Sequence, residues 1–178
     1  EVEELKSQME EVTVKEKASM EFYQGTLNGK EVVVVRSGIG KVNAAICAQI
    51  LVDKFGVDTL INTGVAGSLD ADINIGDIVI STDAVQHDMD VSMLGDPVGQ
   101  ITRMDTFSFP ADEKLVKLAV EVNKEVNPDI QTFTGRVLSG DQFISGKEKK
   151  EYLVKTFDGK CAEMEGAAMA QTAYLNKV

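Results

Sequence analysis

Four short turns, each placed after an apolar stretch that reads as a strand, constrain this chain more than any other feature of its sequence. The turns contain glycine or paired carboxylates and lie at residues 37–40, 63–68, 139–144 and 163–165. Helical patterns follow them, and strands that alternate with helices indicate an α/β fold. Ligands of α/β sheets gather where strands end, so these turns form the candidate site.

The periodicity of the apolar residues predicts the remaining elements. Helices are expected at 1–9, 41–55, 112–127, 147–156 and 166–175, and strands at 12–14, 21–26, 31–35, 59–62, 78–81, 130–138 and 161–165. Asn28-Gly29 predicts a hairpin, and four consecutive valines at 32–35 predict a strand buried on both faces. The apolar row Leu115, Leu118, Ala119, Val122 and Val126 predicts the core-facing side of its helix. No linker or repeat interrupts the pattern, so residues 1–178 are expected to form a single domain.

Charge and cysteine content exclude several classes of partner. The net charge is −11, which opposes binding to nucleic-acid phosphates and to anionic membranes but not to a neutral nucleoside. Cys47 and Cys161 lie far apart in apolar segments and are expected to be buried thiols of a reduced compartment. With no signal-peptide pattern and no long apolar run, a cytoplasmic protein is expected.

The turns each allow a chemical and a purely structural interpretation. The Gly-Ile-Gly sequence at 38–40 could bring the backbone close to a sugar or phosphate, or could simply turn the chain. If 163–165 is extended, Glu163 and Glu165 project from one face, where they could bind a ribose diol or could be solvated. Phe143 could stack on a base or could be a core residue.

His87 is the only histidine, and it lies in the acidic sequence His-Asp-Met-Asp at 87–90. A lone histidine near carboxylates can act as a base or a metal ligand, but one histidine without a cysteine cluster makes a structural zinc site improbable. The sequence contains no nucleophile elbow, no phosphate-binding P-loop and no Cys-x-x-Cys motif. We therefore expect no metal and no cofactor.

Six motifs occur in a characteristic order. They are Ser-Gly-Ile-Gly-Lys-Val at 37–42, Ile-Asn-Thr-Gly-Val-Ala-Gly at 61–67, Gly-Asp-Ile-Val at 76–79, His-Asp-Met-Asp-Val at 87–91, Ser-Gly-Asp-Gln-Phe-Ile at 139–144 and Glu-Met-Glu at 163–165. Taken together, they resemble the 5′-methylthioadenosine/S-adenosylhomocysteine nucleosidases of the nucleoside phosphorylase superfamily. The resemblance implies a nucleoside-phosphorylase-like fold, with a mixed twisted central sheet flanked by helices. It also implies hydrolytic release of adenine, in methionine salvage and methyl-cycle recycling.

The resemblance implies a sugar-binding role for two of the turns. Glu165 would bind the ribose hydroxyls with the Met164 backbone beside it, and Glu163 is a lesser candidate for the same sugar. Ile39 and Met164 would line the sugar and thioether region. Glu1 would be the catalytic carboxylate that activates the attacking water.

The base and the 5′ substituent would be contacted by other positions. Phe143 would stack on adenine, the backbone of Ile144 would read its edge, and Gly67 would lie against the substrate. Val91 and Leu94 fall in the segment that reaches into the partner subunit's 5′-thio pocket in this family. The resemblance therefore implies a homodimer that binds a small nucleoside, without nucleic acid or membrane partners.

Relatives of this kind have structure at both ends that we do not find in the sequence. They begin with a short strand before Glu1, and they continue past Val178 with a strand leading to an Arg-x-Ile-Ser-Asp motif. The aspartate of that motif protonates the leaving adenine. The domain is therefore expected to lack its first strand and its C-terminal strand and helix, and no residue is assigned as general acid. Val65 stands where relatives commonly carry serine or threonine.

Two alternatives stay open at this point. A phosphate-dependent purine nucleoside phosphorylase would need basic residues around a phosphate dianion, and the candidates are Arg36, Lys41, Arg103 and Arg136. A non-catalytic nucleoside-binding fragment is the other alternative. For the hydrolase, a carboxylate near the oxocarbenium-like sugar would stabilise positive charge and accept a proton from water.

Overall fold

The computed structural model describes residues 2–178, and Glu1 lies outside the described residues. Its helices are α1 (Val2–Ser7), α2 (Lys41–Phe55), α3 (Glu113–Val126), α4 (Lys147–Phe157) and α5 (Gly166–Asn176), with a short 3-10 helix η1 (Ser92–Leu94). Its strands are β1 (Glu10–Lys17), β2 (Met20–Leu27), β3 (Lys30–Val35), β4 (Gly67–Ser68), β5 (Ile78–Gln86), β6 (Phe109–Pro110), β7 (Thr132–Ser139) and β8 (Gly159–Glu163). The α/β class is confirmed.

The first sheet is antiparallel, with the order β1-β2-β3. The predicted hairpin is confirmed, because Asn28 and Gly29 both have positive φ angles, 49° and 74°, and join β2 to β3. Phe22 is fully buried and stacks on Phe55 of α2 with ring centroids 5.1 Å apart. The expectation for the four valines was wrong: they are only half-buried, since β3 is an edge strand in the described part of the chain.

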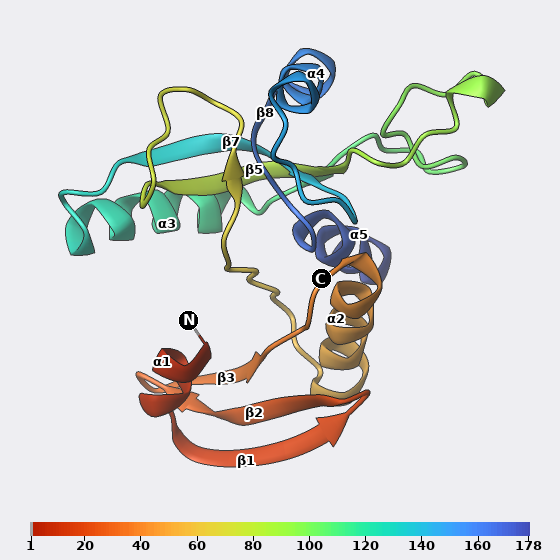
Figure 1. The fold of residues 1–178 in the computed structure, drawn as a ribbon. Helices are drawn as coiled ribbons and strands as arrows, with labels where there is room; N and C mark the ends of the chain where they lie inside the picture. The colour runs from red at the N-terminus through yellow and green to blue at the C-terminus, as the bar shows by residue number, and fades with distance from the viewer. Residues whose placement is uncertain (1) are drawn as a thin grey trace.

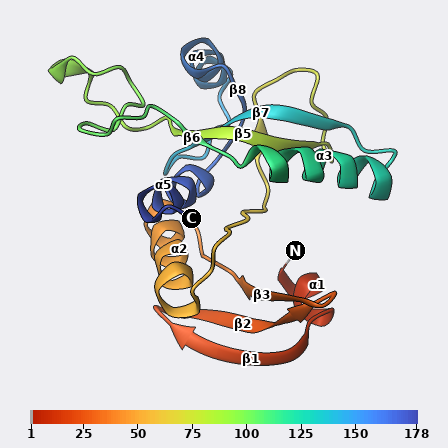
Figure 2. The ribbon, with the colours of Figure 1, turned by 180° about the vertical axis from the view of Figure 1, so that it is seen from behind.

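The second sheet is mixed, with the order β4-β8-β7-β5-β6. Strands β5, β7 and β8 are parallel, while the short edge strands β4 and β6 run antiparallel to their neighbours. Helix α3 lies on one face of this sheet and α4 lies on the other (Figures 1 and 2). Its hydrophobic core includes Val85, Leu138 and Phe157. The predicted mixed sheet with flanking helices is thus confirmed.

Helices α2 and α5 pack against each other between the two sheets (Figure 1). Helix α2 has the predicted bounds and ends at Gly56, whose φ of 61° gives the left-handed C-cap. Its core side consists of Ala44, Cys47 and Ala48. A second apolar row on α2, formed by Val42, Ile46 and Ile50, is not fully covered, because Val42 is 70% exposed.

Helix α3 shows a second difference from the expected burial. Asp112 caps the helix, accepting from the backbone N–H groups of Lys114 and Leu115. However, four of the five residues in the predicted core-facing row are exposed, namely Leu115, Leu118, Val122 and Val126. The helix instead turns Asn123 inward, and its side-chain amide donates to the Thr132 hydroxyl at the start of β7 over 2.7 Å.

The predicted strand at 59–62 does not form. Residues 57–66 run from the end of α2 toward β4, between the two sheets, and make no strand ladder with any described residue (Figure 1). A strand needs a neighbour for its backbone hydrogen bonds, and local sequence cannot supply one. Ile61 and Val65 are exposed here.

The two cysteines are buried free thiols, as predicted. Burial raises the pKa of Cys47 to about 11 and that of Cys161 to about 12, so both are inert thiols at neutral pH. Within residues 2–178, each helix is too short or too polar to cross a lipid bilayer.

Candidate active site

Three of the four predicted turns meet at the N-terminus of α2. The Gly40 N–H donates to Glu165 Oε1 over 2.6 Å, and the next amide, that of Lys41, donates to Asp141 Oδ1 over 2.8 Å. The first N–H groups of a helix lack internal partners and lie at its positive end, so they favour carboxylates. The ends of β3, β7 and β8 are therefore joined at one point.

Glu163 and Glu165 do not share a face, and that expectation was wrong. Strand β8 ends at Glu163, and the chain bends before α5 begins at Gly166. Glu163 Oε2 accepts from the N–H groups of Glu165 and Gly166, over 2.9 and 2.7 Å. Glu163 thus caps α5, while Glu165 points to the start of α2.

Ser139 completes this cap, and the sequence patterns did not single it out for that role. Its buried hydroxyl donates to Glu163 Oε1 and accepts from the Ala167 N–H over 2.7 Å. The last residue of β7 therefore holds both the carboxylate at the end of β8 and the first turn of α5. Its position at the start of the Ser-Gly-Asp turn was the available signal.

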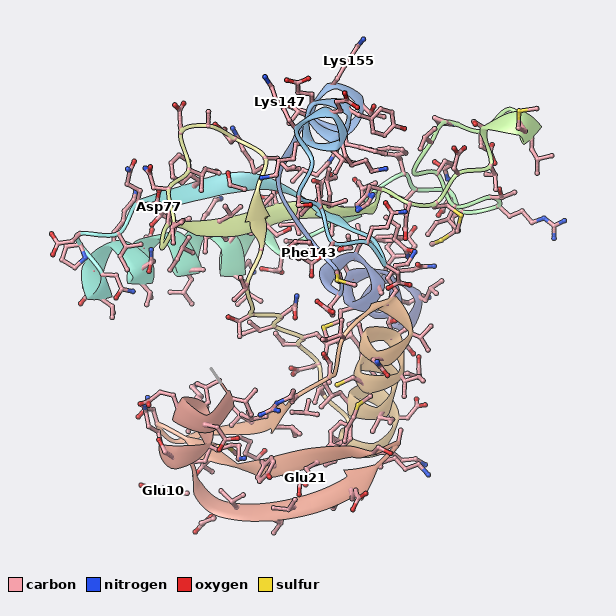
Figure 3. The ribbon with its side chains drawn as sticks, viewed as in Figure 1. Glu10, Glu21, Asp77, Phe143, Lys147 and Lys155 are labelled. Atoms are coloured by element: carbon pink, nitrogen blue, oxygen red, sulfur yellow. The ribbon has the colours of Figure 1, made fainter. Side chains whose placement is uncertain are left out.

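The expected base-binding residues lie in the turns after β7 and before β4. Phe143 is 87% exposed, which excludes the core interpretation, and it lies on the side of the five-stranded sheet that faces α5 (Figure 3). Ile144 is half-buried and packs against the core of that sheet. Its carbonyl oxygen lies 3.9 Å from where a Cβ atom on Gly67 would be, so Gly67 and Ile144 are neighbours.

Two further predicted residues belong to the same region. Ile39 is 75% exposed directly before the start of α2, and its carbonyl accepts from the Asn43 side chain over 2.6 Å. Met164 is half-buried in the bend between β8 and α5. Both follow strand ends that converge at the α2 N-terminus.

Val91 and Leu94 are not brought to these residues within one chain. They lie on the long loop after β5, which extends away from the rest of the molecule at η1 (Figures 1 and 2). Leu94 and the adjacent Met93 are strongly exposed. The loop thus presents apolar side chains away from its own subunit.

A charged network that sequence reasoning missed lies beside the α2 N-terminus. Lys41 Nζ donates to Asp88 Oδ1 over 2.6 Å and to Gln86 Oε1 over 3.0 Å. Asp88 Oδ2 accepts from the Asp141 N–H over 2.9 Å. Burial alone would raise the pKa of Asp88, but the Lys41 ammonium and the Asp141 N–H outweigh it and leave the pKa below its usual value.

His87 lies beneath this network. It is 2% exposed, and neither ring nitrogen has a hydrogen-bond partner among the described residues. Burial lowers its pKa, so the imidazole is neutral near pH 7. Asp88 instead binds Lys41, and Asp90 accepts from the Ser92 N–H. Across residues 2–178, no three His, Cys, Asp or Glu side chains are arranged to hold a metal ion.

Three of the four basic residues considered for phosphate binding, Lys41, Arg136 and Arg36, lie near other polar side chains. Lys41 is bound to Asp88 and Gln86, and Arg136 makes a bidentate pair with Asp83, 2.6 to 3.1 Å long. Arg36 is exposed and lies 3.8 Å from Glu3. The described residues therefore do not gather these side chains into a phosphate site.

Comparison with known proteins gives a consistent set of relatives. The sequence profile described as the phosphorylase superfamily matches residues 1–178. A 5′-methylthioadenosine/S-adenosylhomocysteine nucleosidase of Halalkalibacterium halodurans is 42% identical over 175 residues, which cover 98% of this chain and 74% of the relative.

Solved structures agree with this result. The nucleosidase of the same name from Neisseria meningitidis, in complex with methylthio-immucillin-A, superposes with a TM-score of 0.94 at 35% identity, covering 99% of this chain and 76% of that one. A futalosine hydrolase of Helicobacter pylori is also similar, with a TM-score of 0.91 at 34% identity, covering 98% and 73%.

Proposed function

This chain belongs to the phosphorylase superfamily and, within it, to the 5′-methylthioadenosine/S-adenosylhomocysteine nucleosidases, and from that premise we propose that it hydrolyses the N-glycosidic bond of these two thio-nucleosides to release adenine. One observation carries the proposal for the site. Glu165 is anchored by the Gly40 amide, close to the turn that presents the exposed ring of Phe143. A carboxylate for a sugar and an aromatic side chain for a base are what a nucleoside site requires.

Glu165 is the proposed ribose ligand. Its Oε1 accepts one N–H at the α2 N-terminus, and a carboxylate has remaining lone pairs that can accept from the two ribose hydroxyls. The N–H at the positive end of α2 orients this side chain. Glu163 is not the favoured sugar ligand, because Ser139 and two backbone N–H groups already occupy its oxygens.

Phe143, Ile144 and Gly67 form the proposed adenine site. The exposed Phe143 ring can stack on the purine, and the backbone of Ile144 can read its edge. Gly67 lies beside the Ile144 carbonyl, where the absence of a side chain leaves room for the planar ligand. Ile39 and Met164 line the sugar side.

The chemistry requires a base for water and an acid for the leaving adenine. Glu1, the proposed base, lies outside the described residues, and its role rests on the family resemblance. The oxocarbenium-like sugar develops positive charge, so the Glu165 carboxylate beside the ribose also stabilises the transition state. Lys41 and Arg136 are each held by a carboxylate and so are not free to bind a phosphate dianion, which supports water as the nucleophile.

We propose that each chain folds as a single domain and that two chains form a homodimer. The enzyme is proposed to act in the cytoplasm. The support for the homodimer is the loop after β5, which carries Val91 and Leu94 away from its own subunit. The tip of this loop exposes the apolar side chains of Met93 and Leu94, which can complete the 5′-thio pocket of a second copy.

The proposal is tested by adenine release from 5′-methylthioadenosine in buffers with and without phosphate. Release without phosphate is the expected result. Release that requires phosphate would refute hydrolysis, and release from futalosine alone would reassign the substrate. S-adenosylhomocysteine should serve as a second substrate.

The site is tested in the same assay with the Phe143→Ala variant. Because the ring is 87% exposed, its removal should leave the free energy of unfolding unchanged within about 0.5 kcal/mol. KM should rise about 10-fold or more, in line with the loss of about 1–3 kcal/mol of stacking. Tyr152→Ala, on the exposed side of α4, is the matched control and should behave as wild type. An unchanged KM for Phe143→Ala would remove Phe143 from the site.

A further inference from the structure

We propose that Lys41, Asp88 and Asp141 form a positioning clamp that fixes the three substrate-binding loops relative to one another. The proposal rests on the proposed nucleosidase function for its effect on substrate, but its geometry is independent of it. None of the three side chains is assigned a contact with substrate or with the reacting atoms. Each is committed to another member of the group instead.

The three residues form a closed ring of hydrogen bonds. The Lys41 ammonium donates to one oxygen of Asp88 over 2.6 Å, and the other oxygen of Asp88 accepts the backbone N–H of Asp141 over 2.9 Å. The ring closes where the Asp141 carboxylate accepts the backbone N–H of Lys41 over 2.8 Å. Lys41 is the first residue of α2, while Asp88 and Asp141 lie in the loops after β5 and β7, so the ring joins three segments that are far apart in sequence.

The ion pair of the ring is set in a protected environment, whereas Asp141 is exposed. The side chains of Lys41 and Asp88 are only 20% and 13% exposed, so solvent screens their attraction much less than that of a surface pair. Gln86 also accepts from Lys41, and its own amide donates to Gln171 of α5. The clamp is therefore connected to the helix that follows Glu165.

Two glycines allow the ring to close. A Cβ atom on Gly40 would lie 2.9 Å from Asp141 Oδ1, and Gly40 has a φ of 91°, which other residues rarely adopt. A Cβ atom on Gly140 would lie 3.1 Å from Asp88 Cγ. The glycines of two motifs thus make room for the two carboxylates of the clamp.

The clamp is adjacent to each proposed substrate contact. Gly40, whose amide holds Glu165, directly precedes Lys41. Phe143 follows Asp141 by two positions, and Val91 follows Asp88 by three. Without the clamp, the ribose carboxylate, the base-stacking ring and the partner-directed loop would each move with its own segment. A misplacement of about 1 Å can lower a rate or affinity by about 100-fold.

The test measures adenine release by the Asp88→Asn, Lys41→Met and double variants. Each single variant should raise KM for 5′-methylthioadenosine about 10- to 100-fold with a smaller change in kcat, because the groups that break the bond are left in place. The double variant should be no worse than either single variant, since both remove the same link. Lys41→Arg, which keeps a donor and the charge, should recover most of the loss.

The matched control is the exposed pair Lys147–Glu151 on α4, which is 3.7 Å long with both side chains largely in solvent (Figure 3 labels Lys147). Lys147→Met and Glu151→Gln should leave KM and kcat at wild-type values. Additive effects of Lys41→Met and Asp88→Asn, or unchanged KM in both, would overturn the clamp.

A second readout separates the clamp from the proposed function. In the ligand-free protein, Asp88→Asn should lower the hydrogen-exchange protection of the Asp141 amide, and Lys41→Met should do the same by releasing Asp88. Retained protection in both variants would overturn the clamp even in an active enzyme. If wild type released no adenine, the proposed function would fail, while the exchange measurement would still decide whether the clamp exists.

Discussion

Replacement of Gly140 by alanine tests whether the loop after β7 must lie against the buried histidine. Gly140 is buried, and an added Cβ atom would lie 2.5 Å from His87 Nε2 and 2.6 Å from Cε1. An ordinary contact is 3.4 Å or longer, so the methyl group would overlap the ring by roughly 1 Å.

The ring has nowhere to move. His87 is 2% exposed, and its backbone N–H donates to the Ser139 carbonyl over 2.9 Å. This bond fixes the backbone of His87 beside Gly140. Forcing an extra methyl group into such a site lowers the free energy of unfolding by about 1–3 kcal/mol. In urea, with an m value of about 2–3 kcal/mol/M, the midpoint should fall by roughly 0.3–1.5 M.

The assay is urea unfolding followed by circular dichroism, with Gly64→Ala as the matched control. Gly64 has no atom within 4 Å of an added Cβ and is exposed, so its midpoint should match wild type. The overlap predicts a strong coupling: in a His87→Ala background, which removes the ring and leaves only the 3.1 Å approach to Asp88 Cγ, Gly140→Ala should cost at least about 1 kcal/mol less than in the wild-type background. An equal loss in both backgrounds would refute the steric reasoning.

Two further predictions concern neighbouring groups. Because burial lowers the pKa of His87, the unfolded chain binds a proton that the folded protein does not, so stability should be full above about pH 6.5 and should fall as pH drops below it. A His87→Gln variant should give urea midpoints that vary less between pH 7.5 and 5.5, and an equal slope would contradict the assignment. Ser139→Ala should lose about 1–3 kcal/mol, because it leaves the Ala167 N–H and a Glu163 oxygen without their partner. The exposed Ser145→Ala is its control, and equal unfolding midpoints for the two variants would count against the Ser139 cap.

Features set by neighbouring residues in sequence were predicted well. The bounds of α2, its end at Gly56 and the Asn28-Gly29 hairpin all depend on local backbone preferences, and all are confirmed. The strand at 59–62 and the exposed face of α3 were mispredicted, because strand pairing and helix rotation depend on distant partners. Asn123 illustrates the point. The buried side of α3 carries Asn123, which donates to Thr132, and the apolar row of the helix faces solvent.

The candidate site shows the same division. The rule that ligands gather at strand ends selected turns that the fold brings together, since three of them converge at Gly40 and Lys41. The alternation rule failed for Glu163 and Glu165, because the chain bends between them to start α5. The link between Lys41, Asp88 and Asp141 has no local pattern at all, and only the fold brings these residues together.

Asp141 and Phe143 are two positions apart in the same loop, yet one is fixed by hydrogen bonds and the other projects into solvent. Substitutions of exposed side chains change stability little, whereas those of fixed groups unfold or distort the loop. Under selection by a competitive inhibitor, resistance mutations should therefore accumulate at Phe143 and Ile39, where substitutions do not unfold the protein. If an inhibitor binds mainly to backbone groups such as those of Ile144, fewer side-chain substitutions can weaken its binding.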